Sequence, residues 1–225
     1  MKKWNRSQDL GFSRRDVLKS AGIVGIAAAG SAALLPPSAL EAPPPQTGAL
    51  HTGQALTAQQ FETLTAITGR LIPADANGPG ALEAHAATYI DKALTTHYGD
   101  QRDNYVANLS AVDTFSKATH KAHFSALSPE KQDSVLTAVE NNDVEKSFGF
   151  IPDARTFFNL VLDHTQEGMF SDPFYGGNAN FIGWDLLDFP GVKLEFSAAE
   201  QQLDYPIVKA HRSAYSYRLF NAGKY

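Results

Sequence analysis

The residues best suited to acid–base chemistry are Asp163, His164, Glu167 and Asp172, which lie together at the start of an aromatic stretch. A histidine beside carboxylates can accept and release a proton near neutral pH. The same residues are also typical of a helix C-terminus, where a histidine bonds the last carbonyls and complements the helix dipole. Because no nucleophile or metal-ligand set accompanies them, we favour the structural interpretation.

His120 and His123 are spaced three residues apart and could share a metal ion on one face of a helix. They lie among Lys117, Lys121 and other polar residues, so a solvated helix face explains them better. No glutamate is followed three residues later by a histidine, and there is no nucleotide-binding glycine loop, no Gly-x-Ser-x-Gly and no His-Glu-x-x-His. The sequence therefore predicts no catalytic set, metal site or cofactor site in this chain.

The most unusual stretch is Glu167–Gly191, which is rich in aromatic residues, glycine and proline. Its rings can form a small core folded over neighbouring helices, or a surface that binds another protein, and both alternatives stay open. The aromatic tail Tyr215–Phe220 has little helix signal and is a candidate arm across a partner. The candidate interface residues are Phe170, Phe174, Tyr175, Trp184, Phe189 and Tyr217.

The elements that position these residues read as an all-α bundle of five or six helices, followed by an extended C-terminal tail. Start signals are the capping box Thr57–Gln60, the pair Ser128-Pro129 and Asp153, and Ser197–Glu200 is a further capping box. Apolar spacing predicts five helices, over about 58–72, 81–97 and 101–124, from Pro129 through Val139, and over about 154–167, with the aromatic stretch as a long loop. The second is expected to bury Leu82, Tyr89, Ile90, Ala93 and Leu94.

The first 42 residues resemble an export signal. Arg14-Arg15 and Leu18 precede an apolar run, Ala21–Leu35, that is too short for a membrane span of about 20 residues. Adjacent arginines in this context are typical of the twin-arginine signal, which exports folded proteins; an ordinary secretory signal is the alternative. We expect a Pro-rich linker over 43–56 and a helical domain over 57–225.

Charge and composition narrow the class of partner. Without the six Lys/Arg and three Asp/Glu of residues 1–42, the chain keeps 13 basic and 21 acidic residues. An acidic body argues against nucleic acid as a partner. The absence of cysteine excludes disulfides, thiolate metal sites and covalent c-type haem in this chain.

Two motifs carry a resemblance to a known family. The first is Leu-Ile-Pro-Ala-Asp-x-x-x-Pro-Gly-Ala at 71–81, and the second comprises Gly168-Met169-Phe170, Asp172-Pro173, Tyr175–Asn178, Gly183-Trp184 and Pro190-Gly191. Together with the leader, they resemble the gluconate 2-dehydrogenase subunit 3 family over roughly residues 55–195. The chain has Leu186–Phe189 where the family more usually has Gly-Tyr before Pro-Gly.

The resemblance implies a role that the spacing of residues did not show. Members are small subunits of membrane-associated dehydrogenases that oxidise sugars, sugar acids or polyols. In these, a large subunit holds FAD and a multihaem cytochrome c subunit passes electrons on. The small subunit is thought to carry the twin-arginine address for the large one and to help it fold.

Two functions follow as expectations. The first is a noncatalytic escort subunit in the periplasm, recognised by the twin-arginine translocase and associated with the inner membrane through partners or an uncleaved leader. The second is a free-standing periplasmic enzyme or sugar-binding protein that uses the aromatic loop as a cleft.

Overall fold

The computed structural model describes residues 55–221, and within them the fold is all-α, as the sequence predicts. Five helices have eight or more residues: α2 (Ala58–Leu71), α3 (Ala86–Ala93), α4 (Arg102–His120), α5 (Pro129–Asn141) and α6 (Ala154–Phe170). Two short helices follow, α7 (Ile182–Leu186) and α8 (Arg218–Asn221). The predicted signal, with Arg14, Arg15 and Leu18, and linker residues 43–54 lie outside the described range and stay predictions.

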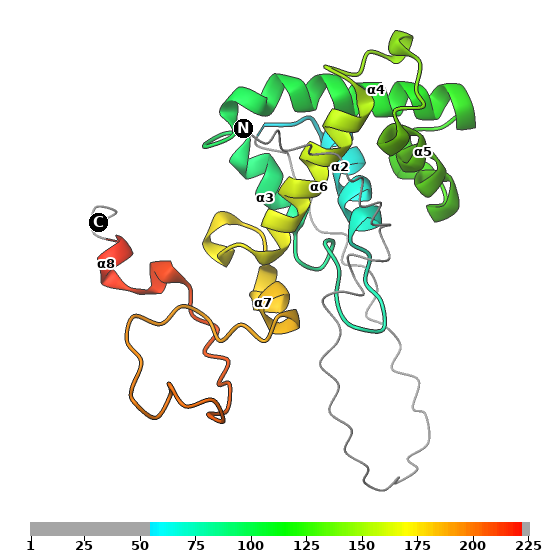
Figure 1. Cartoon of the computed structure of the whole chain (residues 1–225). Helices are drawn as coiled ribbons and strands as arrows, with labels where there is room; N and C mark the ends of the chain where they lie inside the picture. The colour runs from blue at the N-terminus through cyan, green and yellow to red at the C-terminus, as the bar shows by residue number, and fades with distance from the viewer. Residues whose placement is uncertain (1–54, 222–225) are drawn as a thin grey trace, which may run out of the picture. The chain divides into compact units, whose positions relative to one another are not determined.

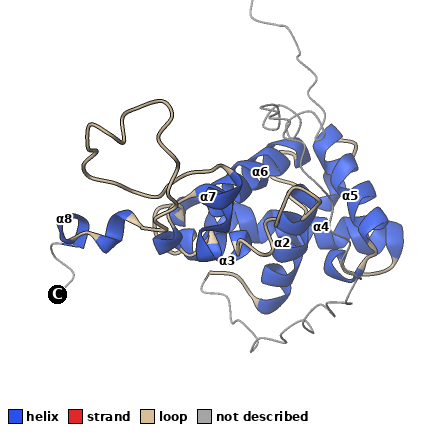
Figure 2. Ribbon diagram, turned by 90° about the horizontal axis from the view of Figure 1, so that it is seen from below, coloured by secondary structure: helices blue, strands red, loops and turns tan. Residues whose placement is uncertain are grey.

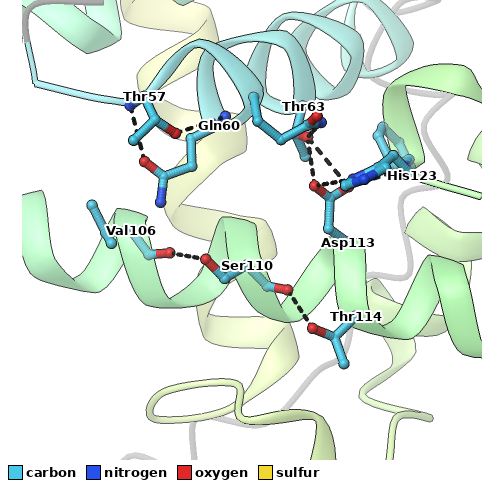
Figure 3. Close-up of polar contacts among 10 residues, drawn as sticks. Thr57, Gln60, Thr63, Val106, Ser110, Asp113, Thr114 and His123 are labelled. Atoms are coloured by element: carbon cyan, nitrogen blue, oxygen red, sulfur yellow. Dashed lines mark hydrogen bonds and ion pairs between the residues drawn. The ribbon is translucent and has the colours of Figure 1, made fainter.

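Local capping explains where the principal helices begin. The Thr57 side chain accepts from the Gln60 N–H while the Gln60 side chain accepts from the Thr57 N–H, so both bonds of the predicted capping box are present (Figure 3). Pro129 occupies the first turn of α5, and Asp153 accepts from the Thr156 N–H at the start of α6. These helix starts are therefore fixed within four residues of sequence.

Helix α6 contacts α2, α3, α5 and α7 (Figure 1). Its inward face supplies Phe157, Phe158 and Val161, and α4 adds Tyr105, Leu109 and Val112 from the other side of the core. Figure 2 shows α6 beside α2 and α7, with α4 and α5 at one end of the bundle. Helix α6 thus ends at Phe170, within the first residues of the aromatic stretch.

Buried polar side chains join elements that are distant in the sequence. Asp113 of α4 accepts from the Thr63 hydroxyl of α2 at 3.3 Å and from the Phe124 N–H at 2.9 Å (Figure 3). Asn108 bonds both backbone groups of Ile151, and Asp91 accepts from the Ala55 N–H and the Leu56 N–H. Figure 3 also shows that the Ser110 and Thr114 hydroxyls donate to carbonyls one turn back along α4, so these hydrogen bonds stay within the helix.

Several predicted boundaries are wrong. Residues 81–85 form turns rather than helix, because His85 has a left-handed φ of 58° just before α3. Leu82 is therefore 50% exposed instead of buried, whereas Tyr89, Ile90, Ala93 and Leu94 are buried as expected. Helix α4 ends at His120, and α6 continues three residues beyond the predicted end at Glu167.

Among the helices described, none is both long and apolar enough to cross a membrane.

Candidate partner interface

The aromatic stretch is built around the C-terminus of α6, whose last carbonyls need partners. The Asn178 N–H donates to the Gly168 carbonyl at 2.7 Å, and the Trp184 indole N–H donates to the Phe170 carbonyl at 2.8 Å. The Asn178 side chain donates to the Ser171 carbonyl and accepts from the Gly183 N–H, each at 2.8 Å. This stretch is therefore a folded cap for α6.

Three glycines of the second motif allow backbone segments to touch. A Cβ at Gly168 would lie 2.9 Å from the Ala86 backbone, so this glycine lets α6 approach α3. A Cβ at Gly177 would lie 2.0 Å from the Gly168 carbonyl oxygen, and one at Gly183 would lie 1.9 Å from the Met169 carbonyl oxygen. Side chains at the last two positions would separate the cap from the helix.

The structure places the six candidate interface residues in different surroundings. Trp184 is only 6% exposed and packs edge-on against Phe189, with its indole nitrogen turned to the α6 carbonyl. Phe170 lies in the last turn of α6 and is partly buried. Of the two alternatives left open by the sequence, Trp184 fits the small core folded over the helices. It offers little surface to a partner.

Phe174 and Tyr175 are more exposed, but the C-terminal tail covers part of both. The Phe174 and Tyr215 rings stack with centroids 3.6 Å apart, and the Tyr175 and Tyr215 hydroxyls are 2.8 Å apart. The Asp172 carboxylate accepts from the Ser213 hydroxyl at 2.6 Å and from the Ala214 N–H at 2.8 Å. The tail thus returns to the aromatic stretch through specific polar and ring contacts.

A second set of contacts closes the loop between α7 and the tail. The Val192 N–H donates to the Arg212 carbonyl and the Ala210 N–H donates to the Pro190 carbonyl, both at 2.8 Å. The Tyr217 hydroxyl, one of the six candidates, donates to the Val192 carbonyl at 2.8 Å. Tyr217 therefore fastens the base of this loop.

Charged residues support the same base. His211 lies 2.8 Å from the Asp185 carboxylate, and this hydrogen bond lowers the pKa of Asp185. Lys209 lies 3.1 Å from the Asp188 carboxylate, and hydrogen bonding to that carboxylate raises the pKa of Lys209. The His211 ring also stacks on Phe181.

Exposed large apolar side chains gather after α6. Of fifteen such residues in the described chain, only Leu82 and Ile151 precede residue 170. The others are Phe174, Tyr175, Leu186, Leu187, Phe189, Leu194, Phe196, Leu203, Tyr205, Ile207, Val208, Leu219 and Phe220. A soluble protein rarely leaves so many apolar groups uncovered along one segment unless another molecule covers them.

The predicted acid–base cluster is not assembled. Asp163 is exposed, Asp172 bonds the tail, and His164 and Glu167 bond different tyrosine hydroxyls. The Glu167 carboxylate accepts from the Tyr89 hydroxyl at 3.0 Å and from the Tyr98 hydroxyl at 2.9 Å.

His164 is buried inside α6 and stacks on the Tyr98 ring, with centroids 4.1 Å apart. Its Nδ1 lies 2.8 Å from the Tyr105 hydroxyl. Burial lowers the pKa of His164 and raises the pKa of Tyr105 well above its usual range. His164 therefore contacts tyrosine side chains of the core rather than the last carbonyls of α6, which differs from the helix C-terminus interpretation favoured from the sequence.

The His120 and His123 pair also has a structural explanation. Helix α4 ends at His120, so the two rings do not share a helix face, and His123 Nδ1 lies 3.0 Å from the Asp113 carboxylate (Figure 3). Within residues 55–221, no group of three or more His, Asp and Glu side chains is arranged to hold a metal ion.

A family model described as gluconate 2-dehydrogenase subunit 3 matches residues 58–191. The chain belongs to this family. The match covers more than half of the chain, includes both motifs, and agrees with the family suggested by the sequence. No curated protein and no solved structure matches the chain significantly. As a member of this family, the protein is a subunit of an oxidoreductase complex, which implies partner subunits.

Sequence reasoning missed the apolar residues between Val192 and Arg212. Their signal was present, because Leu194, Phe196, Ile207 and Val208 follow the turn residues Pro190-Gly191 without helical spacing. Asn178 was placed in the second motif, but its role was not predicted: its backbone and side chain hold three segments of the α6 cap together.

Proposed function

We propose that this protein is the noncatalytic small subunit of a periplasmic, FAD-dependent dehydrogenase of the gluconate 2-dehydrogenase type. It binds and stabilises the flavin-bearing large subunit, while a multihaem cytochrome c subunit completes the complex. Family membership supports the complex, and the observation that carries the binding role is the run of exposed apolar residues after α6. Surfaces of this composition are typical of protein–protein interfaces.

Three carboxylates of the described residues bond groups of the protein's own fold. Glu167 is occupied by two tyrosines, Asp113 by Thr63 and His123, and Asp172 by the tail. In this proposal the redox chemistry belongs to FAD and haem in the partner subunits. The small subunit contributes shape and apolar surface.

The export role rests on Arg14, Arg15 and Leu18. The twin-arginine route transports folded proteins, so one signal can carry a partner that is already bound. We propose that the escort and folding roles are linked in this way: the large subunit folds against the small one and is then exported with it.

Co-expression with the large subunit tests this proposal. Replacing Arg14→Lys and Arg15→Lys together should leave both proteins in the cytoplasm, whereas Arg6→Lys, a basic control outside the pair, should leave export unchanged. Immunoblots of cytoplasmic and periplasmic fractions measure the outcome. Continued export of the large subunit from the double variant would contradict the escort role.

The sugar-binding alternative gains no support from the aromatic stretch. A sugar ring would stack on exposed aromatic faces, but Phe174 already stacks on Tyr215 and Phe181 already stacks on His211. Calorimetry of the isolated protein with gluconate, glucose and fructose should therefore show no tight binding. Tight binding by the isolated chain would replace the subunit proposal with this alternative.

A further inference from the structure

The segment between the two base contacts, residues 193–209, forms a protruding arm. Its base is closed by the Val192–Arg212 and Ala210–Pro190 hydrogen bonds and by the ion pair of Lys209 with Asp188. Figures 1 and 2 both show this loop, between α7 and α8, standing away from the helices. The family match ends at residue 191, so the arm lies outside the part that the family model covers.

The arm exposes apolar side chains from both of its limbs. Leu194 is 47% and Phe196 56% exposed on the outgoing limb, and Ile207 is 62% and Val208 64% exposed on the returning limb. Leu203 and Tyr205 are also exposed between the limbs. Neither limb is helical, and the backbone hydrogen bonds within the arm lie in the turns from Ser197 to Tyr205.

A short-range polar structure shapes the tip without covering these groups. The Ser197 and Glu200 side chains bond each other's backbone N–H groups, which is the capping box predicted from the sequence, although only turns follow it. Lys193 also pairs with Glu200, and the hydrogen bond from Lys193 lowers the pKa of Glu200 to about 2. The arm is thus closed at its base and turns at its tip.

The charge of the arm indicates the class of molecule that covers it. Residues 193–209 contain two basic and three acidic residues, and charged and apolar residues alternate over Lys193–Phe196. An anionic membrane surface would require a cluster of basic residues, which is missing here. Mixed charges beside exposed apolar side chains fit a protein surface, where apolar pockets accept the large side chains and a polar rim faces the charged ones.

We propose that the arm, residues 193–209, docks into an apolar groove on the flavin-bearing large subunit and supplies the main contact between the two chains. The inference rests on the proposed function and adds the location of the interface. The aromatic stretch is less available for this contact, because Phe174 stacks on Tyr215 of the tail and Trp184 donates a hydrogen bond to the Phe170 carbonyl at the end of α6. The arm carries six of the fifteen exposed large apolar side chains in the described residues.

Binding of the full chain to the purified large subunit tests the arm directly. The triple variant Phe196→Ser, Ile207→Ser and Val208→Ser should weaken binding by about tenfold or more, as expected when hot-spot side chains are truncated. Leu82→Ser is the matched control, because Leu82 is similarly exposed but lies before α3. It should leave the dissociation constant within about twofold of wild type, as is usual outside an interface. Circular dichroism should show the same helix content in all three proteins.

A photo-crosslinking residue at position 196 or 207 provides a second measurement, with position 151 as the exposed control. Crosslinks from the arm to the large subunit support the proposal. Unchanged affinity in the triple variant, or arm crosslinks that join two copies of this chain, would overturn the arm inference alone. Failure of the wild-type chain to bind the large subunit would instead contradict the proposed function, and the arm inference with it.

Discussion

Residues 168–191 and residues 192–221 are neighbours in the sequence and both are rich in large apolar side chains, but they bury them differently. The first region caps α6, and its glycines, Asn178 and Trp184 are held against helix carbonyls at hydrogen-bond distance. The second region touches the rest of the protein through its base and tail contacts and leaves Phe196, Ile207 and Leu219 exposed. The first region therefore packs its motif residues against α6 while Phe174, Tyr175, Leu186, Leu187 and Phe189 stay partly exposed, whereas the second region leaves its large apolar residues mostly exposed.

This difference separates the residues that identify the family from those that we expect to bind a partner. The matched motif needs glycine at three positions, because two backbone segments lie so close there that a Cβ atom would not fit. A partner contacts exposed groups, and most of these lie on or beyond α7. Substitutions in the first region should therefore change stability, whereas substitutions in the arm should change binding.

The largest effect on stability is expected at Gly177. Gly177→Ala places a Cβ 2.0 Å from the Gly168 carbonyl oxygen, so the cap must move away from α6, at a cost of about 4 kcal/mol in the free energy of unfolding. Gly99→Ala is the control, because its Cβ would meet nothing nearer than 3.9 Å, and it should change stability by no more than about 0.5 kcal/mol. Urea unfolding measures both, and equal stabilities would contradict the close packing of the cap.

A smaller loss is expected at Asn178, which is fully buried. Asn178→Ala removes two side-chain hydrogen bonds and leaves the Gly183 N–H and Ser171 carbonyl unpaired, at a cost of about 3 kcal/mol. Asn180→Ala is a control with the same left-handed backbone, at φ 55° against 44°, but an exposed side chain. The Asn180→Ala variant should lose about 1 kcal/mol of unfolding free energy, from the left-handed backbone alone. Equal losses in urea unfolding would show that the side-chain bonds contribute nothing.

His164 should make the stability of the helical domain depend on pH. Burial lowers its pKa in the folded protein, so the unfolded chain, with a pKa near 6.5, takes up the proton first as the pH falls. Stability should therefore be highest above pH 6.5 and should decrease as the pH falls from 6.5 to the lower pKa of folded His164. The nearby charges of Glu167 and Asp163 oppose this shift without reversing it.

The double variant His164→Phe and Tyr105→Phe tests the origin of that pH dependence. It replaces both partners of one buried hydrogen bond by apolar rings, so stability at pH 8 should stay within about 1 kcal/mol of wild type. The decrease between pH 6.5 and 5 should become smaller, as measured by thermal unfolding in matched buffers. An unchanged pH profile would assign the dependence to other groups.

The smallest effect on stability is expected in the arm. Each of Phe196→Ser, Ile207→Ser and Val208→Ser should change the free energy of unfolding of the isolated chain by no more than about 0.5 kcal/mol, because these side chains are already exposed. Thermal unfolding of the isolated protein checks this. A large loss would mean that the arm packs against its own domain, and the distinction between the two regions would fail.

The starts of α2, α5 and α6 could be predicted because capping acts over a few residues, as Thr57, Pro129 and Asp153 show. The start of α3 could not, because His85 adopts a left-handed backbone where apolar periodicity continues without a break. The end of α6 was missed for a related reason. Its last turn is stabilised by Asn178 and Trp184, which follow it in the sequence and reach it only after the chain folds back.

The sequence by itself determined the all-α class, the main helices and the family, because helix caps, apolar spacing and the two motifs are local properties. Only the tertiary structure decided which aromatic and aliphatic residues are covered. Trp184 and Phe196 look equally apolar in sequence, yet one is 6% and the other 56% exposed. Burial depends on which distant backbone groups come within reach, and here that is set by the α6 carbonyls, which hold Trp184 but leave the arm uncovered.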